Sequence, residues 1–358
     1  MRRAFHHTFR QIYGGSMPAA RLRASVWQSA FTHDGPRYRR ALYDRMGDIP
    51  TLVIGESGTG KELVARAIGL SRYMPFDEKT ASFADDYASS FQAVNLSALS
   101  PTLIESELFG HRRGAFTGAV EDRTGWLESC RPLGAVFLDE IGELEPGIQV
   151  KLLRVFQTRT FQRIGETRER SFSGKIIAAT NRDLADEMRD GRFRADLYYR
   201  LAADVIQMPT LREQLADAPE DLDNLARILA KRVAGDEEGE VLAEEVSRFV
   251  RESLPAGYPW PGNMRELEQC VRSVLVRGSY QPAEARPRAG APEALAMPAG
   301  PLGGLADALR NVSWSADELV SRYCAFVYAR LGSYQETARR LGLDRRTVKA
   351  KVDSVSGR

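Results

Sequence analysis

The sequence predicts an α/β protein with a parallel sheet between helices, then a helical subdomain and a separate all-α unit with a helix-turn-helix. Short apolar runs alternate with amphipathic stretches up to residue 210, which is typical of parallel strands covered on both faces. Helical periodicity alone continues over 211–280. A Pro- and Ala-rich stretch at 281–304, with the composition of an extended linker, separates this part from a helical and basic region at 305–358.

Composition excludes several classes of protein. The 358 residues suffice for two or three domains, and the three cysteines form no CxxC pair. No signal peptide and no apolar run of about eighteen residues is present. We therefore expect no zinc site, no disulfide framework and no membrane span, in a protein of the reducing cytoplasm. The net charge of +2 does not by itself indicate nucleic acid. About fifty residues precede the first strand, too few for a sensor domain, so we expect regulation to come from outside this chain.

A glycine-rich turn between a strand and a helix is the strongest local motif. Residues 55–62 read GESGTGKE, after the apolar run 51–54 and before a helical run at 63–68. Backbone N–H groups and the helix dipole favour phosphate there, and Lys61 can reach the outer phosphates; the alternative is an ordinary strand-helix turn. The predicted nucleotide-binding residues of this loop are Gly55, Glu56, Ser57, Gly58, Thr59, Gly60, Lys61 and Glu62. Because Glu62 replaces the usual Ser or Thr ligand of magnesium, the metal must depend more on a carboxylate elsewhere.

Four further apolar runs are predicted strands, at 91–96, 135–140, 175–181 and 204–209. Each run turns polar at its carboxyl end, which is where ligands bind in parallel sheets. Asp139 can hold magnesium there, and Glu140 can orient or deprotonate a water molecule. As an isolated pair these acids would more often form a solvated sheet edge. Thr180 and Asn181 can add polar groups beside the outer phosphate.

A glycine-bounded loop lies between the second and third strands. Residues 107–111 read ELFGH and residues 114–119 read GAFTGA. Phe116 lies among small residues and belongs to no periodic core pattern. Two interpretations stay open at this point: a mobile loop tip that exposes Phe116, or a tight turn that buries it.

The carboxyl-terminal region carries a helix-turn-helix pattern. Residues 334–351 read YQETARRLGLDRRTVKAK. Ala338, Gly342 and Val348 have the required spacing, and Asp344 can cap the second helix. A short basic two-helix element is the alternative. The predicted DNA-binding residues are Arg345, Arg346, Thr347, Lys349 and Lys351.

Six motifs over roughly residues 50–275 resemble one family. In order they are GESGTGKE, ESELFGHRRGAFTGA, FLDEIGEL, AATNRDL, FRADLYYRL and WPGNMREL. They resemble the central domain of the sigma-54-dependent transcriptional activators, bacterial enhancer-binding proteins of the AAA+ ATPase class. Residues 334–351 are similar to the Fis-type DNA-binding module that ends many of them, preceded by dimerisation helices over 311–331. Glu62 is the family's usual form, whereas 31–48 and 77–90 look like insertions and the turn after 211–213 departs from the family pattern.

The resemblance implies a AAA+ P-loop core with a helical lid, assembled as a ring, usually a hexamer, that uses ATP and Mg2+. The resemblance implies that Lys61 binds phosphate, Asp139 binds magnesium and Glu140 activates water. It further implies that Asn95 is a switch residue that holds Glu140, that Thr180 and Asn181 form the first sensor and that Arg265 is the lid sensor. Arg194 and Arg200 would be arginine fingers that reach the nucleotide of the neighbouring subunit. The implied sigma-54 contact is Gly114, Ala115, Phe116, Thr117, Gly118 and Ala119.

The favoured function is an ATP-hydrolysing activator that binds upstream enhancer DNA and remodels sigma-54 RNA polymerase closed complexes into open ones through the GAFTGA loop. The alternative is a DNA-binding regulator that uses nucleotide only to control assembly. A loop at 114–119 together with Glu140 favours the first, because a regulator that does not remodel polymerase has little reason to keep both. A AAA+ chaperone is disfavoured by the helix-turn-helix.

Overall fold

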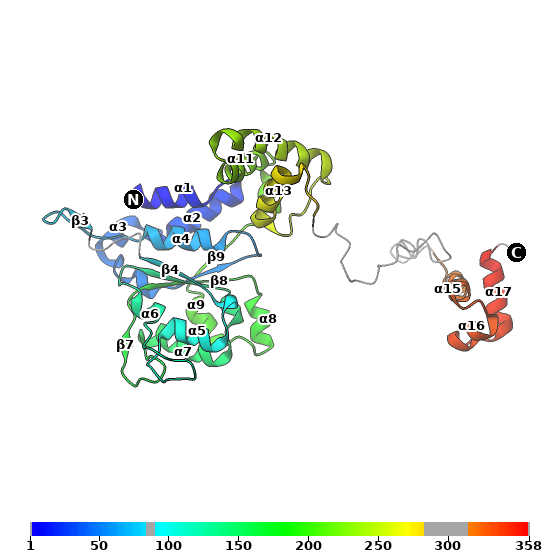
Figure 1. The fold of residues 1–358 in the computed structure, drawn as a ribbon, viewed down its shortest axis with the longest axis horizontal. Helices are drawn as coiled ribbons and strands as arrows, with labels where there is room; N and C mark the ends of the chain where they lie inside the picture. Colours follow the sequence, from blue (N-terminus) through cyan, green and yellow to red (C-terminus); the bar gives the residue numbers. More distant parts are fainter. Residues whose placement is uncertain (1, 84–89, 283–313, 357–358) are drawn as a thin grey trace. The chain divides into compact units, whose positions relative to one another are not determined.

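Five parallel strands form the sheet that organises the first part of the chain (Figure 1). The computed structural model describes residues 2–83, 90–282 and 314–356, and the chain divides into two units, Met1–Tyr280 and Gln281–Arg358. The strands are β1 (Thr51–Ile54), β4 (Phe91–Asn95), β5 (Ala135–Asp139), β8 (Lys175–Thr180) and β9 (Asp204–Gln207), in the spatial order β4-β5-β8-β1-β9. All five predicted strands are therefore confirmed.

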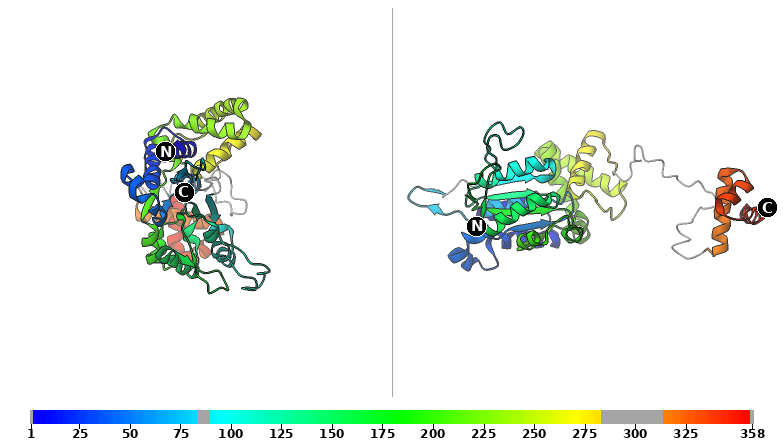
Figure 2. Two further views of the ribbon diagram at one scale, coloured as in Figure 1. Left: turned by 90° about the vertical axis from the view of Figure 1, so that its left-hand side faces the viewer. Right: turned by 90° about the horizontal axis from the view of Figure 1, so that it is seen from below.

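Helices cover both faces of this sheet, as Figure 2 shows from two sides. Successive strand residues point to opposite faces, so Leu52 enters one apolar core and Val53 the other. The Val53 face packs against α2 (Met17–Phe31), α4 (Lys61–Ser71) and Ile12, which follows α1 (Arg2–Gln11). The Leu52 face packs against α5 (Pro101–Phe109), α7 (Pro146–Thr158), α8 (Leu184–Arg189) and α9 (Ala195–Leu201). A sheet buried on both faces explains why its strands read as continuous apolar runs.

Several short elements connect these layers. Two are antiparallel hairpins, β2 (Phe76–Asp77) with β3 (Ser82–Phe83) and β6 (Thr160–Phe161) with β7 (Arg170–Ser171). The others are η3 (Leu96–Ala98), α6 (Trp126–Ser129) and η4 (Ile141–Glu143). The β2–β3 hairpin begins one residue before the insertion predicted at 77–90, of which residues 84–89 lie outside the described part.

The first fifty residues hold more structure than the sequence predicted. The helices α1 and α2 were not predicted, and they are followed by α3 (Gly35–Arg37), the π-helical η1 (Tyr38–Leu42) and the 3-10 turn η2 (Arg45–Asp48). Phe31, Tyr38 and Met46 anchor this segment in a small apolar cluster. The predicted insertion at 31–48 therefore packs onto the core.

A helical subdomain follows the last strand, as predicted. It consists of α10 (Leu211–Asp217), α11 (Asp221–Ala234), α12 (Asp236–Ser253) and α13 (Asn263–Arg277). Leu225, Val246 and Val271 are among the residues of its own apolar core. A capping box between Thr210 and Glu213 begins α10. These helices form the lid of the cavity described below.

Three helices make up the described part of the second unit: α15 (Ala316–Leu331), α16 (Tyr334–Leu341) and α17 (Arg345–Ser356). Ala338 and Val348 lie in its core beside Cys324. Gly342 ends α16 with φ +66°, and the Asp344 carboxylate accepts a hydrogen bond from the Arg346 N–H at 2.8 Å. The predicted turn glycine and helix cap are thus observed. The predicted linker at 281–304, beyond residue 282, and residues 305–313 lie outside the described part.

Within residues 2–83, 90–282 and 314–356, no helix has the length and hydropathy needed to cross a membrane.

Lys175 at the start of β8 makes stability depend on pH. It is 1% exposed, and its Nζ donates to the Ile49 carbonyl oxygen at 2.7 Å. Burial lowers the Lys175 pKa to about 7, against an opposing effect of Asp204. Since the unfolded lysine keeps a pKa of about 10.4, the unfolded state binds the proton more tightly, and the folded state gains stability as pH rises through this range.

We expect Lys175→Met to remove that gain. Between pH 7 and pH 9 the wild type should gain about 2 kcal/mol of unfolding free energy relative to this variant. Urea unfolding at the two pH values measures the difference. Lys151→Met, on the exposed face of α7, is the control and should follow the wild type. Parallel pH profiles for wild type and Lys175→Met would contradict the assignment.

Candidate nucleotide-binding site

A cavity of about 530 Å³ lies where the carboxyl edge of the sheet meets the lid helices. Its wall includes residues 57–62 of the glycine-rich loop, Asn95 at the end of β4, Asp139 and Glu140 of β5 and its turn, and Arg265 of α13. Parallel strands end at one edge of a sheet, which is why residues distant in sequence meet here. Most residues predicted to handle nucleotide thus share one cavity.

The loop between β1 and α4 requires its glycines. Gly58 and Gly60 have φ of +79° and +92°, a region in which side chains are unfavourable. A Cβ at Gly58 would also collide with the carbonyl oxygen of Gly262, in the segment that leads into α13. Gly58 therefore serves both the turn and the close approach of the lid.

Lys61 begins α4 and is 7% exposed. Its Nζ donates to the carbonyl oxygens of Gly55 at 3.0 Å and Glu56 at 3.3 Å, and lies 3.9 Å from Glu140 Oε1. Burial lowers the pKa of Lys61, while Glu140 and Asp139 oppose that shift. The ammonium is thus held at the loop, with less solvation than a surface lysine.

Asp139 ends β5, partly shielded from solvent inside the same cavity. Burial raises its pKa, and the charge of Lys61 only partly opposes this. The negative charge of the Asp139 carboxylate is therefore only partly balanced by the protein, which favours the binding of a cation. Magnesium is held in many phosphate sites by one or two carboxylates together with the phosphates. Asp139 fits Mg2+.

Glu140 lies next to Asp139 with an unusual backbone. Its φ is +56°, and Asp139 Oδ1 accepts its N–H at 3.1 Å. Its own Oε2 accepts the main-chain N–H of Asn181 at 3.2 Å. One carboxylate oxygen thus faces Lys61 and the other faces the turn after β8. Residues held in such conformations cluster at functional sites.

Asn95 and Thr180 make contacts that sequence reasoning did not predict. The Asn95 side chain lines the cavity, but its Oδ1 accepts from Ser97 N at 3.0 Å and Ser97 Oγ at 2.8 Å. Thr180 is fully buried, and its Oγ1 accepts from Arg182 N at 3.0 Å. In this structure Glu140 is therefore held by Asn181, and Thr180 and Asn181 border the cavity without lining it.

Asn263, at the start of α13, joins the lid to the phosphate loop. It is 0% exposed with φ +51°, and its Nδ2 donates to Glu56 Oε2 at 3.0 Å and Ser57 O at 3.1 Å. Its Oδ1 accepts from Leu211 N at 2.8 Å. Arg265 Nη1 donates to Ser57 Oγ at 3.0 Å. The lid is therefore seated directly on the loop, despite the unusual turn after 211–213.

Arg194 and Arg200 lie outside the cavity, at the two ends of α9. The Arg194 guanidinium makes a two-pronged contact with Asp196, at 3.0 and 2.7 Å. Arg200 is exposed, and we find no hydrogen bond or ion pair for its side chain within the described chain. Neither arginine reaches the nucleotide cavity of its own chain.

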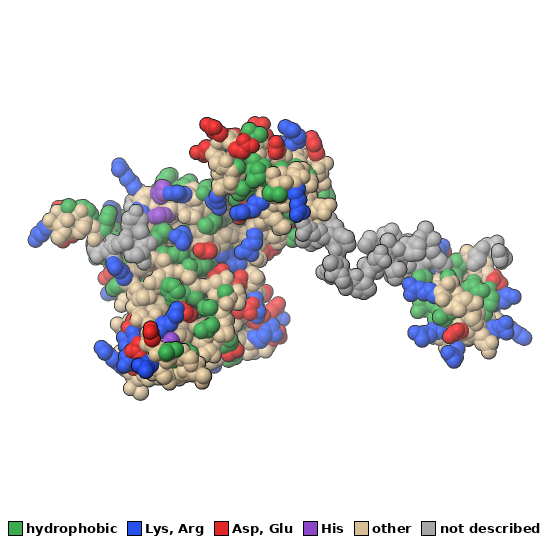
Figure 3. Space-filling model, viewed as in Figure 1, with side chains coloured by type: hydrophobic (Ala, Val, Ile, Leu, Met, Phe, Trp, Pro, Cys, Tyr) green, Lys and Arg blue, Asp and Glu red, His purple; other side chains and the backbone are tan. Residues whose placement is uncertain are grey.

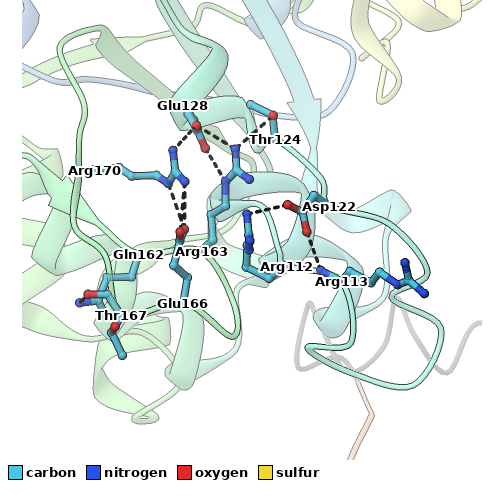
Figure 4. A network of polar contacts seen from close by, with 10 residues as sticks. All are labelled: Arg112, Arg113, Asp122, Thr124, Glu128, Gln162, Arg163, Glu166, Thr167 and Arg170. Atoms are coloured by element: carbon cyan, nitrogen blue, oxygen red, sulfur yellow. Dashed lines mark hydrogen bonds and ion pairs between the residues drawn. The ribbon is translucent and has the colours of Figure 1, made fainter.

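The loop at 114–119 is held at its base by a polar network, drawn in Figure 4. The Glu128 carboxylate accepts from Arg163 at 2.7 and 2.8 Å and from Arg170 at 2.5 Å. Asp122 binds the Arg112 side chain at 2.6 Å and the Arg113 N–H at 2.8 Å. Bidentate arginine–carboxylate contacts fix geometry more firmly than single ion pairs. The base of the loop is thus held by several charge-assisted contacts.

The tip of that loop folds on itself. Gly114 N donates to Ala119 O at 2.8 Å, and Ala119 N donates to Phe116 O at 3.0 Å. Phe116 is half-buried, its ring centroid 4.9 Å from that of buried His111 in an edge-on arrangement. It borders a hollow of about 300 Å³ between α5 and α7. The result lies between the two open interpretations: a tight turn that leaves Phe116 partly accessible.

The second helix of the helix-turn-helix carries an exposed cationic face. Arg345, Arg346, Thr347 and Lys349 are exposed, and several basic side chains project from the visible face of this unit in Figure 3. Lys351 differs, because its Nζ pairs with Asp317 of α15 at 2.7 Å and it is half-buried. Its charge is engaged inside the unit.

Sequence reasoning missed several residues at the cavity. Ile12 and Tyr13 after α1 and Arg232 of α11 line it, and Asn263 clamps it. Of these residues, only Asn263 lies in a motif identified from the sequence, WPGNMREL. The network around Glu128 had none, because its members are separate in sequence.

Three comparisons identify relatives. The family model described as the sigma-54 interaction domain matches residues 38–207. The Nif-specific regulatory protein of Azotobacter vinelandii is 46% identical over 226 residues, 63% of this chain and 39% of that protein. The transcriptional regulatory protein ZraR of Klebsiella oxytoca is 40% identical over 343 residues, 91% of this chain and 69% of that protein. A crystal structure of NtrX from Brucella abortus in complex with ADP is similar with a TM-score of 0.56 and 25% identity, covering 96% of this chain and 69% of that one.

The chain thus spans between 39% and 69% of the length of these relatives. The family model, the ZraR likeness across most of both chains and the fold of the NtrX structure all agree with the motifs at the cavity. The chain belongs to the sigma-54-dependent transcriptional activators and has the AAA+ fold of that family.

Proposed function

We propose that this chain hydrolyses ATP as a hexameric ring, binds upstream enhancer DNA, and remodels sigma-54 RNA polymerase closed complexes into open ones. The observation that carries this proposal is the convergence of Lys61, Asp139, Glu140 and Arg265 on one cavity. The proposed parts are an ATPase subdomain at 1–210, a lid at 211–280, a linker at 281–304 and a DNA-binding unit at 305–358.

Phosphate binding and water activation fall to different residues of the cavity. Lys61 and the loop N–H groups bind the phosphates, and Asp139 holds Mg2+, which neutralises phosphate charge when bound. Glu140 accepts a proton from the attacking water, because its carboxylate lies between Lys61 and the Asn181 N–H. The switch would be a movement in which the Glu140 carboxylate leaves the Asn181 N–H and binds the Asn95 side chain instead.

Arg194 and Arg200 are proposed to act on the neighbouring subunit's nucleotide. Both are exposed and neither lines the cavity of its own chain, so a role at the phosphates requires a second subunit. Arginine supplied in this way stabilises transition-state charge. Hydrolysis then depends on assembly.

The loop at 114–119 is the proposed contact with sigma-54. Phe116 is half-buried beside a hollow between α5 and α7, so small movements of these helices would alter its exposure. An apolar side chain at such a tip is explained by a partner that covers it. The exposed cations of α17 are the proposed contact with DNA.

Glu140→Gln keeps an oxygen for the Asn181 N–H but cannot take a proton. We expect ATP turnover to fall about a hundredfold or more, with ATP affinity within a few-fold of wild type. Phosphate release and calorimetric titration measure the two quantities. Glu143→Gln, three residues away and paired with Arg182, is the matched control. Wild-type turnover in Glu140→Gln would remove its role. In the same assay, turnover per subunit should fall on dilution, since the arginines act between subunits.

Phe116→Ala removes the ring at the loop tip without touching the cavity. We expect ATP hydrolysis within about twofold of wild type and no open-complex formation, because the ring makes the proposed contact with sigma-54. Promoter opening by purified full chain and sigma-54 RNA polymerase is the readout. Val120→Ala, exposed on the same loop, should open promoters normally. If wild type hydrolyses ATP but opens no promoter, the chain is instead a regulator that uses nucleotide for assembly only.

Replacing Arg346 and Lys349 together by Ala removes two exposed cations of α17. Without these cations, fewer phosphates of the DNA are neutralised, so DNA binding and its salt dependence should both decrease. We expect roughly tenfold or greater weakening of DNA affinity at moderate salt, measured by titration of labelled promoter DNA. Basal ATP hydrolysis should not change. Arg330→Ala on α15 is the control, and equal binding by the double variant and the control would refute the assignment.

A further inference from the structure

Asp221 at the start of α11 joins two segments that lie about two hundred residues apart in the chain. Its carboxylate is 1% exposed. Oδ1 and Oδ2 both accept the Gly15 N–H at 2.8 Å, and Oδ2 also accepts the Ser16 N–H at 2.9 Å. A buried carboxylate bound to main-chain N–H groups forms strong, charge-assisted hydrogen bonds. The segment before α2 is therefore tied to the first turn of α11.

Both joined segments continue into the wall of the nucleotide cavity. Just before Gly15, residues 11–13 line the cavity. On α11, the cavity-lining residues follow Asp221 at helical spacing on one face; they are Leu225, Ile228, Leu229 and Arg232. One carboxylate thus ties together two segments that contribute to the cavity wall.

This part of the cavity differs in chemistry from the phosphate end. Ile12, Tyr13, Leu225, Ile228 and Met208 line it. Apolar and aromatic walls suit a flat heterocyclic base, whereas the charged residues Lys61, Asp139 and Glu140 gather at the glycine-rich loop. Given the proposed function, the apolar end receives the base.

We propose that Asp221 is a positioning residue for the base of the bound nucleotide, acting through Gly15–Ser16 and through its own helix. A second tether supports the same segment, because Arg23 Nη1 donates to Gly14 O at 2.8 Å and Ile12 O at 3.3 Å. Loosening either tether widens the base end and leaves the phosphate loop intact. Asp221 therefore contributes to affinity for the nucleoside part and not for the triphosphate.

Asp221→Asn tests this, because the amide is isosteric but replaces one acceptor oxygen by a donor that opposes the Gly15 and Ser16 N–H groups. Calorimetry of the full chain with Mg2+ compares ATP with inorganic tripolyphosphate, which has no base. We expect about a tenfold loss of ATP affinity and less than a twofold loss of tripolyphosphate affinity. KM for ATP should rise similarly, with kcat at saturation nearly unchanged.

Asp217→Asn is the matched control, since exposed Asp217 also accepts a main-chain N–H at the start of α2, from Met17 at 2.7 Å, but lies on α10. It should bind both ligands like wild type. Equal losses of ATP and tripolyphosphate affinity in Asp221→Asn, or no loss, would overturn the proposal. If that variant does not fold, Arg23→Met decides by the same comparison. A wild type that binds neither ligand would instead refute the proposed nucleotide site.

Discussion

The parallel pairing of β1 with β8 on one side and β9 on the other is the constraint on which the rest of the first unit depends. Its register sets Ile54 opposite Thr180, and the β4–β5 register sets Asn95 opposite Asp139. Because both faces of the sheet are buried, a slip of one residue would exchange Leu52 and Val53 between the two cores. The apolar cores thus fix the strand ends, and the strand ends fix the site.

Backbone strain is concentrated where the lid meets this edge. Glu140, Trp260 and Asn263 are three of the six non-glycine residues with positive φ in the described ranges. Each such residue costs on the order of 1 kcal/mol. Asn263 offsets its cost with contacts to both the loop and α10. The strain is therefore tolerated because the surrounding contacts determine these conformations. The contact between the lid and the glycine-rich loop is then sensitive to changes in the loop.

The sequence predicted what local patterns encode. The five strands, the glycine-rich turn and the Gly342 turn with its Asp344 cap depend on residues close in sequence, and all are confirmed. The helix α2 was missed because its apolar residues are spread around the helix, whereas α1 is strongly amphipathic and its pattern was overlooked among basic and aromatic residues. The contacts of Asp221 with Gly15 and of Glu128 with Arg163 join distant segments, so a single sequence contains no signal for them. Lys351 was placed with the exposed cations because its partner Asp317 lies on another helix.

The charges of the cavity link nucleotide binding to the lid. Burial lowers the pKa of Lys61 and raises that of Asp139, so each charged form is incompletely compensated by the protein. The charge of Arg265 from the lid lowers the Lys61 pKa further, although it opposes the rise at Asp139. Closing the lid therefore brings a second cation toward Lys61, which is unfavourable unless phosphate lies between them. Thermodynamic linkage is reciprocal: if closing the lid increases the affinity for phosphate by some factor, bound phosphate favours the closed lid by the same factor. Asn263 and Arg265 both contact the loop at Ser57, so under the proposed function a phosphate bound at the loop would act on the lid through direct contacts.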